Sequence, residues 1–215
     1  MLTRLHDTPV AGVAMGNVTL LRLDTGGGIK DLQSERPAAA VFADGRHVGT
    51  LDRTKGEAAA LDLPKGQPAN ETLDILVEAM GRVNYGPRLL DRKGITERVT
   101  LNAMTLMGWD VYPLPMDGDY LRLLRYSRRP AERPGNFFRG AFDLGTVGDT
   151  YLDMSGWRKG VVWVNGHNLG RYWDIGPQKR LYCPGTFLRT GANEIVVFDL
   201  HALAPAPVAG FADLD

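Results

Sequence analysis

The densest group of residues that could bind a ligand lies at positions 161–173, VVWVNGHNLGRYW. Proteins bind sugars with aromatic rings that stack on C–H patches and with planar donors and acceptors that fix the hydroxyl groups. The segment supplies these residue types as His167, Asn168, Arg171, Tyr172 and Trp173. They are therefore our candidates for carbohydrate contact.

The same segment also has a purely structural interpretation. Asn165 and Gly166 favour a hairpin turn, because both central turn positions need φ > 0. Trp163 would then fill the core beneath the hairpin, and Arg171 would pair with a carboxylate. Large aromatic residues beside a tight turn serve packing more often than binding, so the sequence favours this interpretation and leaves sugar contact open.

A second polar group occupies the loop EAMGRVNYGPRLLDRKG, residues 78–94. Its side chains could line a polar pocket, or they could brace the loop against a neighbouring domain. The residues concerned are Glu78, Arg82, Asn84, Tyr85, Arg88 and Asp91.

Charge and apolar patterning exclude two classes of partner. The 25 basic residues balance 25 acidic ones, so no overall field attracts nucleic acid or an anionic membrane surface. Apolar runs such as EIVVF are too short to cross a bilayer. We expect the arginines of residues 113–135 to form solvated or inter-domain ion pairs, because only Tyr126 interleaves them: Arg122, Arg125, Arg128, Arg129 and Arg133.

Metal, cofactor and redox chemistry also lack a signature. The four histidines show no metal-ligand spacing, and the single cysteine, Cys183, excludes an internal disulfide. TGGG at 25–28 lacks the Lys-Ser/Thr of a phosphate-binding loop. We therefore expect no cofactor, although a calcium ion held by loop oxygens would leave little trace in a sequence. No secretory signal is visible at this N-terminus, so a chain complete as given is expected in the cytoplasm.

Short β-rich runs separated by Gly and Pro predict an all-β protein. Leu73, Ile75 and Val77 alternate with period two, and Val162 with Val164 opposes Val161 with Trp163. No segment shows a capped helical repeat over three turns, which excludes a (β/α)₈ barrel. The expected strands lie in residues 17–23, 38–43, 72–80, 98–104, 109–114, 136–144, 150–154, 159–166 and 193–200.

The chain also repeats itself. AVFADGRHVGTL (40–51) aligns without gaps to VVWVNGHNLGRY (161–172), LDLPKG (61–66) matches LYCPGT (181–186), and ANETLDILVE matches ANEIVVFDL. Three landmarks in the same order predict two homologous sandwiches. We place the first at residues 1–115 and the second at 136–215, with a Pro- and Arg-rich linker at 116–135.

Residues 156–200, GWRKGVVWVNGHNLGRYWDIGPQKRLYCPGTFLRTGANEIVVFDL, resemble the last β-domain of family 35 glycoside hydrolases, the retaining β-galactosidases. VFADGRHVGTLDR and the following segment through ITERVTL, with its E-x-MGRVNYG motif, are similar to the preceding β-domain. The resemblance covers residues 38–200 and implies two tandem jelly-roll sandwiches of the galactose-binding-like type. Residues 1–35 depart from the family pattern, and the first strand of the first sandwich could be rebuilt from them.

The family carries its two catalytic glutamates on a (β/α)₈ barrel that precedes these sandwiches, and nothing in this chain maps onto them. The resemblance therefore implies a non-catalytic β-sandwich portion of a glycoside hydrolase, which scaffolds and weakly binds galactosides. By the same analogy, the 78–94 loop braces a neighbouring domain. The expected partners are a galactoside or other carbohydrate, a catalytic barrel domain or subunit, and a second copy of the chain.

Two other hypotheses stay open. A freestanding glycosidase would need a pair of carboxyls roughly 5 Å apart, for which the first candidates are Glu78, Asp91, Asp110 and Asp174. An independent lectin-like module would bind galactosides without any catalytic partner.

Overall fold

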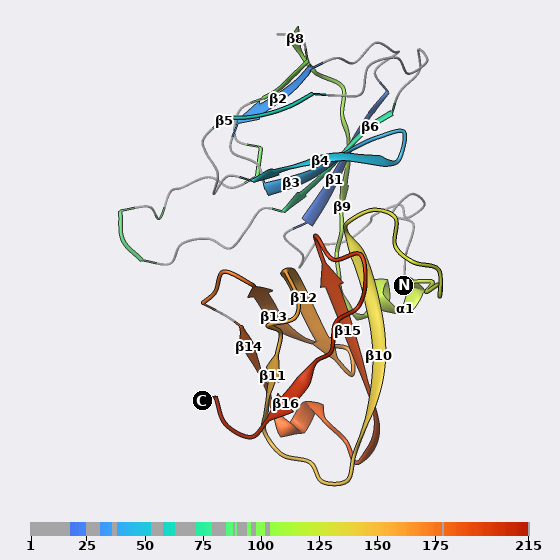
Figure 1. Cartoon of the computed structure of the whole chain (residues 1–215), viewed down its shortest axis with the longest axis vertical. Helices are drawn as coiled ribbons and strands as arrows, with labels where there is room; N and C mark the ends of the chain where they lie inside the picture. Colours follow the sequence, from blue (N-terminus) through green and yellow to red (C-terminus); the bar gives the residue numbers. More distant parts are fainter. Residues whose placement is uncertain are drawn as a thin grey trace. The chain divides into compact units, whose positions relative to one another are not determined.

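The computed structural model places two compact units in the chain, one ending at Met116 and the other running from Asp117 to the C-terminus. Each unit is an antiparallel β-sandwich (Figure 1). The structure describes residues 18–24, 31–35, 38–52, 58–62, 72–78, 85–87, 89, 94–95, 98–101, 104–177 and 179–214.

The first sandwich consists of a five-stranded and a four-stranded sheet. The five-stranded sheet has the order β4-β3-β6-β1-β9, with β4 Arg46–Asp52, β3 Ala38–Ala43, β6 Thr72–Glu78, β1 Val18–Asp24 and β9 Asp110–Pro113. The second sheet has the order β5-β2-β7-β8, with β5 Ala58–Asp62, β2 Asp31–Glu35, β7 Val99–Leu101 and β8 Met104–Thr105.

The central strand β6 is buried on both faces. Leu73, Ile75 and Val77 pack into the core between the sheets, as their alternation predicted. On the opposite face, Asp74 lies buried beside Arg22, its cross-strand neighbour on β1. The guanidinium donates from Nε to Asp74 Oδ1 at 2.7 Å and from Nη2 to Oδ2 at 2.9 Å, a bidentate pair that satisfies the buried carboxylate.

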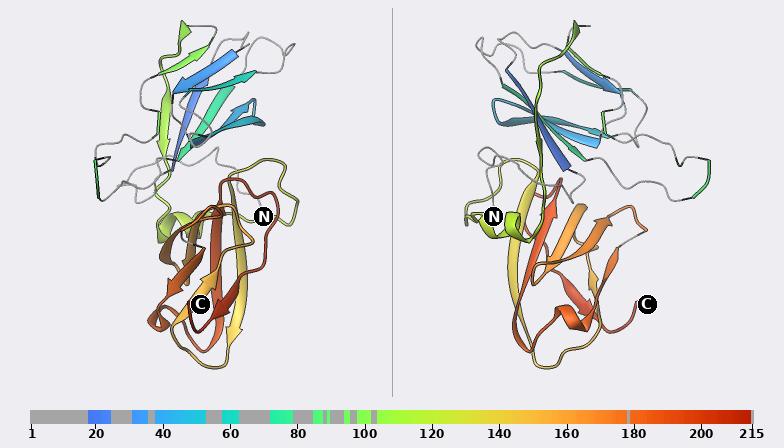
Figure 2. Two further views of the ribbon diagram at one scale, coloured as in Figure 1. Left: turned by 60° about the vertical axis from the view of Figure 1, so that its left-hand side comes forward. Right: turned by 180° about the vertical axis from the view of Figure 1, so that it is seen from behind.

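The second sandwich packs a four-stranded sheet against a three-stranded one (Figures 1 and 2). The larger sheet has the order β10-β15-β12-β13, with β10 Asn136–Leu144, β15 Gly191–Asp199, β12 Lys159–Val164 and β13 His167–Trp173. The smaller sheet has the order β14-β11-β16, with β14 Arg180–Cys183, β11 Thr150–Asp153 and β16 Ala209–Phe211. A 3₁₀ turn, Gly185–Phe187, joins β14 to β15.

The two faces of the larger sheet pack against different elements. Val162 and Val164 belong to the core between the sheets. On the other face, Trp163 is fully buried, and Phe137 lies between it and Tyr120 of the short helix α1, Gly118–Leu123. The segment 116–135, expected as a linker, thus contributes a helix that covers the outer face of the second sandwich.

The two sandwiches share one topology. Strands β4-β3-β6-β1 take the same order as β13-β12-β15-β10, and β5-β2-β7 the same order as β14-β11-β16. The register of both hairpins shifts at the equivalent point, between Val41 and Phe42 and between Val162 and Trp163. The duplication inferred from the sequence is therefore a duplication of structure, and β1, drawn from the atypical N-terminal residues, occupies the place of β10.

The hairpin turns are equivalent as well. Asp44 and Asn165 both adopt positive φ, 47° and 49°, as the Asp-Gly and Asn-Gly signals predicted. The Asp44 carboxylate accepts the backbone N–H of Thr72 at 2.8 Å, and the Asn165 carbonyl oxygen accepts that of Glu194 at 3.0 Å. Each turn is thereby anchored to the interior strand beside it, β6 in the first sandwich and β15 in the second.

Candidate functional site

The five expected sugar-contact residues lie on strand β13, at the edge of the larger sheet of the second sandwich. Cross-strand pairing separates them into two groups. Asn168, Arg171 and Trp173 lie opposite Trp163, Val161 and Lys159 of β12, on the sheet face that also carries Trp163. His167 and Tyr172 point to the other face, toward the core between the sheets.

Tyr172 is a packing residue, which corrects its expected place among the sugar contacts. Its side chain is buried, and its hydroxyl donates to Asp199 Oδ2 at 2.8 Å. Burial raises the pKa of Tyr172 well above its usual value, and the adjacent charge of Asp199 raises it further. The ring is therefore unavailable for stacking on a ligand.

The buried carboxylate of Asp199 is fully engaged. Besides the tyrosine hydroxyl, it accepts the backbone N–H groups of Arg158 at 2.9 Å, His201 at 2.7 Å and Ala202 at 2.8 Å. Four donors around one carboxylate compensate for removing its charge from water. This cluster is structural, and it fixes the ends of β12 and β15.

His167 and Asn168 are exposed but engaged locally. The His167 ring stacks on Phe187 with centroids 4.1 Å apart and planes inclined by 9°. The Asn168 side-chain oxygen accepts the backbone N–H of Gly170 at 2.7 Å. Both side chains keep further polar groups that a ligand could reach.

Trp173 and Arg171 form an aromatic and polar pair on the edge strand. Arg171 is exposed and Trp173 is half-buried, and their i,i+2 spacing sets both on one face of the edge strand. The Lys159 ammonium lies 4.0 Å from the centre of the Trp173 ring, so one face of the indole carries a cation–π contact. Beside it, Asp174 pairs with Arg158 at 3.5 Å.

The polar loop of residues 78–94 is described only in part. Glu78 is buried at the end of β6, and Tyr85 is 88% exposed. Arg82, Asn84, Arg88 and Asp91 lie outside the described residues.

The carboxylates proposed for a freestanding glycosidase do not meet within the described part of the first sandwich. Glu78 lies opposite Val18 at one end of β1, whereas Asp110 lies opposite Arg22 near the other end. Four residues of strand separate the two positions by about 13 Å. Retaining hydrolysis needs roughly 5 Å, so this pair cannot perform it.

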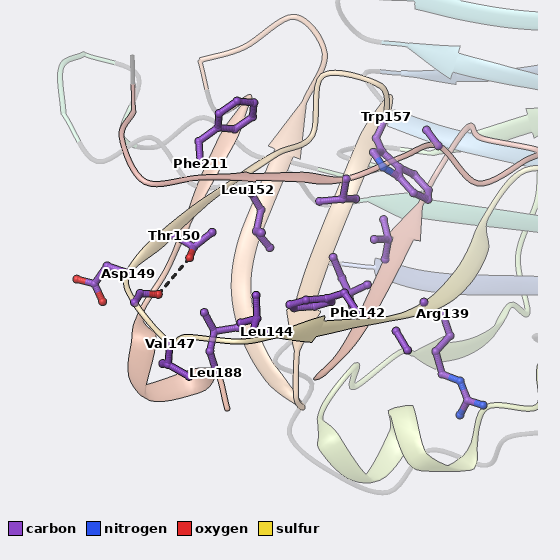
Figure 3. A pocket seen from close by; sticks show the side chains of 18 of the residues that line it. Arg139, Phe142, Leu144, Val147, Asp149, Thr150, Leu152, Trp157, Leu188 and Phe211 are labelled. Atoms are coloured by element: carbon purple, nitrogen blue, oxygen red, sulfur yellow. Dashed lines mark hydrogen bonds between the residues drawn. The ribbon is translucent and has the colours of Figure 1, made fainter. Parts of the chain in front are cut away.

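Sequence reasoning missed a cavity of about 710 Å³ in the second sandwich, which we call the slot (Figure 3). It lies between the two sheets, along the side formed by β10, β11 and β16. Its buried lining consists of Phe138, Leu152, Trp157, Leu188 and Val197, and its rim is formed by residues 146–149 and 210–212.

Two glycines help to leave the slot unfilled. Gly140 of β10 faces Ile195, and Gly210 of β16 faces Thr150, so both strands present a hydrogen where a side chain would enter the interior. The alternation of Phe138, Gly140, Phe142 and Leu144 is visible in the sequence. The opposing wall of the slot cannot be recognised in the sequence, because it is supplied by β11 and β16, whose pairing only the fold reveals.

Polar groups lie at the rim of the slot. Asp149 is exposed, and its carboxylate accepts the backbone N–H of Gly185 at 2.8 Å and the hydroxyl of Tyr182 at 2.7 Å. These two hydrogen bonds hold the pKa of Asp149 below its usual value, and the bond from the Gly185 backbone has the larger effect. Thr150 donates to the Gly148 carbonyl at 3.1 Å (Figure 3). The slot therefore combines an apolar interior with an ionised acceptor at its rim.

The described residues contain neither a metal-binding cluster nor a membrane-spanning helix. No group of three or more His, Cys, Asp or Glu side chains there could hold a metal ion. No helix in that part of the chain is long and apolar enough to cross a membrane.

Comparison with known proteins identifies both sandwiches. Residues 23–115 match the family model of the β-galactosidase first all-beta domain, and residues 136–193 match that of the β-galactosidase galactose-binding domain. Together the two matches cover well over half of the chain.

Individual relatives agree with these matches. A β-galactosidase of Xanthomonas manihotis is 43% identical over 150 residues, which cover 68% of this chain and 24% of that protein. The human β-galactosidase-1-like protein 2 is 42% identical over 173 residues, covering 77% of this chain and 26% of that protein. The chain thus spans about a quarter of the length of the curated relatives it matches. A lectin of Pleurotus ostreatus in complex with GalNAc aligns with 14% identity and a TM-score of 0.26 over 91% of this chain and 72% of that one, too low to support an argument.

Proposed function

The chain belongs to the β-galactosidase family through its first all-beta domain and its galactose-binding domain, and from this premise we propose that it is a non-catalytic, galactoside-binding β-sandwich portion of a β-galactosidase-like glycoside hydrolase. The observation that carries the proposal is the exposed Arg171 beside the half-buried Trp173, on one face of an edge strand inside the galactose-binding domain. A ring face and a planar donor at this spacing suit a pyranose, whose C–H patch stacks while its hydroxyls accept hydrogen bonds.

The non-catalytic part of the proposal is supported by the carboxylates. Glu78 of β6 and Asp110 of β9 lie beside opposite ends of strand β1 in the first sandwich. Asp174 of the second sandwich pairs with Arg158. Neither arrangement offers the nucleophile and acid of a glycosidase. The partner that would supply them is a catalytic barrel, either in the same polypeptide or as a separate subunit, and assembly with a second copy of the chain is also part of the proposal.

The catalytic claim is tested with a chromogenic nitrophenyl β-galactoside. We expect no release of nitrophenol above the background of buffer. Turnover that survives repurification and disappears when one carboxylate of this chain is replaced would contradict the proposal.

The binding claim is tested by titration calorimetry with methyl β-galactoside. We expect saturable binding that weakens at least about tenfold in Trp173→Ala, because the stacking surface is lost. Tyr85→Ala removes an aromatic ring that is 88% exposed on the first sandwich, and as the matched control it should leave the affinity unchanged. Equal affinities in the two variants would remove Trp173 from the site, and absence of binding at millimolar sugar would refute the proposed function.

A further inference from the structure

The slot has the dimensions of a ligand site and not those of a packing defect. Protein interiors are close-packed and leave few voids larger than a water molecule. A cavity of about 710 Å³ falls instead within the range of roughly 300–1,000 Å³ that small-molecule sites occupy. We propose that the slot binds the alkyl or aryl part of an amphiphile, whose uncharged, hydroxyl-bearing head lies at the rim beside Asp149.

The interior of the slot specifies the apolar part of this ligand. Phe138, Leu152 and Val197 present ring and aliphatic surface from both sheets. Trp157 borders the cavity (Figure 3). Its indole packs against Phe138 with ring centroids 5.1 Å apart. The indole N–H is buried without an acceptor among the described residues, so Trp157 contributes ring surface and not a hydrogen bond. Removing an alkyl chain from water against such walls is favourable in proportion to the area buried.

The rim specifies the head. Each oxygen of the Asp149 carboxylate accepts one hydrogen bond from the protein, and a carboxylate has about four acceptor positions, so hydroxyl donors can still be bound. The negative charge of Asp149 disfavours an anionic head. The guanidinium of Arg139, farther along β10, lies 4.8 Å over the Tyr126 ring and 3.7 Å from Glu194, so its charge is engaged away from the rim. An uncharged head with several hydroxyls, as in an alkyl or aryl glycoside, can donate to the free acceptor positions of Asp149.

This site is separate from the galactoside site proposed above. The slot lies between the two sheets, whereas Arg171 and Trp173 lie on the opposite face of the larger sheet. The two sites therefore fail or succeed independently, and the probe for the slot is chosen so that it is not a galactoside.

The test is titration calorimetry of the full chain with octyl β-glucoside below its micelle concentration. Because each buried methylene strengthens binding about fourfold, hexyl β-glucoside should bind more than tenfold more weakly than the octyl compound. Octanoate should bind more weakly than octyl glucoside, because its charge meets Asp149. Free galactose should not compete, since it has no apolar part.

Two variants locate the binding. Leu144→Trp replaces a leucine that lines the slot with a larger indole side chain. Because the indole would fill part of the slot, this variant should lose octyl glucoside binding. Leu123→Trp makes the same substitution at a leucine that is 72% exposed on α1, and it should leave binding unchanged. Circular dichroism of both variants checks that they fold.

The wild-type chain provides a measurement that needs no variant. Octyl glucoside should move the indole N–H resonance of Trp157 in a nitrogen–proton correlation spectrum. Absence of binding, equal affinities for the hexyl and octyl compounds, or full affinity in a folded Leu144→Trp variant would each overturn the proposal.

Discussion

Tyr172 provides a sharp test of the division between packing and binding residues on strand β13. In Tyr172→Phe the ring stays in the core and only the hydroxyl is lost, together with its bond to the buried carboxylate of Asp199 at 2.8 Å. Hydrogen bonds to charged groups contribute roughly 1.5–3 kcal/mol, so we expect the free energy of unfolding of the second sandwich to fall by about 2 kcal/mol. Galactoside affinity should not change, because the hydroxyl faces the interior.

Urea unfolding followed by tryptophan fluorescence measures this loss. Trp157, Trp163 and Trp173 lie in the second sandwich, and Trp109 lies in the first, so most of the signal reports on the unit concerned. A loss below about 0.5 kcal/mol, or a loss of galactoside affinity in a folded variant, would refute the assignment of Tyr172 as a packing residue.

The pH dependence gives the same test a second readout. Burial and the charge of Asp199 raise the pKa of Tyr172 in the folded chain. In the unfolded chain this pKa is about 10, so above pH 10 the unfolded chain loses the hydroxyl proton while the folded chain keeps it. The contribution of the hydroxyl is therefore complete below pH 10 and is lost as the pH rises further. The difference in stability between wild type and Tyr172→Phe should accordingly stay constant up to that pH and shrink above it.

Three further substitutions or reactions test the second sandwich. Gly160→Ala would place a Cβ 1.7 Å from the Phe198 carbonyl oxygen and should cost at least about 4 kcal/mol by thermal melting, whereas Gly145→Ala, with nothing within 4 Å, should melt like the wild type. Asn193→Ala removes a buried amide that joins the β12–β13 turn to the loop before β15. Urea unfolding should show that the free energy of unfolding falls by about 3 kcal/mol, and a fall under about 1 kcal/mol would mean that water replaces these hydrogen bonds. Burial raises the pKa of Cys183 to about 11, so a thiol reagent should react with it at pH 8 only after unfolding, and rapid reaction in the native chain would contradict its buried position.

The architecture could be predicted because its signals are local or repeated. The Asp44-Gly45 and Asn165-Gly166 turns require a backbone conformation that few residue types adopt, and period-two alternation marked the face of β6 that enters the core. The internal repeat then predicted that both halves of the chain fold into the same kind of sandwich, and the two do share one strand order. These features depend on neighbours in the sequence, which a single chain displays directly.

The functional details depended on contacts that the sequence does not display. Arg171, Tyr172 and Trp173 are consecutive, yet the pleat turns the tyrosine toward the core and the other two away from it. The alternation was visible, but which face is covered depends on the smaller sheet and on helix α1. The slot was hidden for a similar reason, because Gly210 contributes to it only once β16 pairs with β11.

The central claim, that the chain binds galactosides at Trp173, is tested most directly by a nitrogen–proton correlation spectrum of the full chain titrated with methyl β-galactoside. The chain has four tryptophans, so its four indole N–H resonances can be assigned by single Trp→Phe variants. Our account predicts that the sugar shifts the Trp173 resonance in a saturable manner and leaves that of the buried Trp163 unmoved. A spectrum in which no indole resonance responds to millimolar galactoside, or in which only another tryptophan responds, would contradict it.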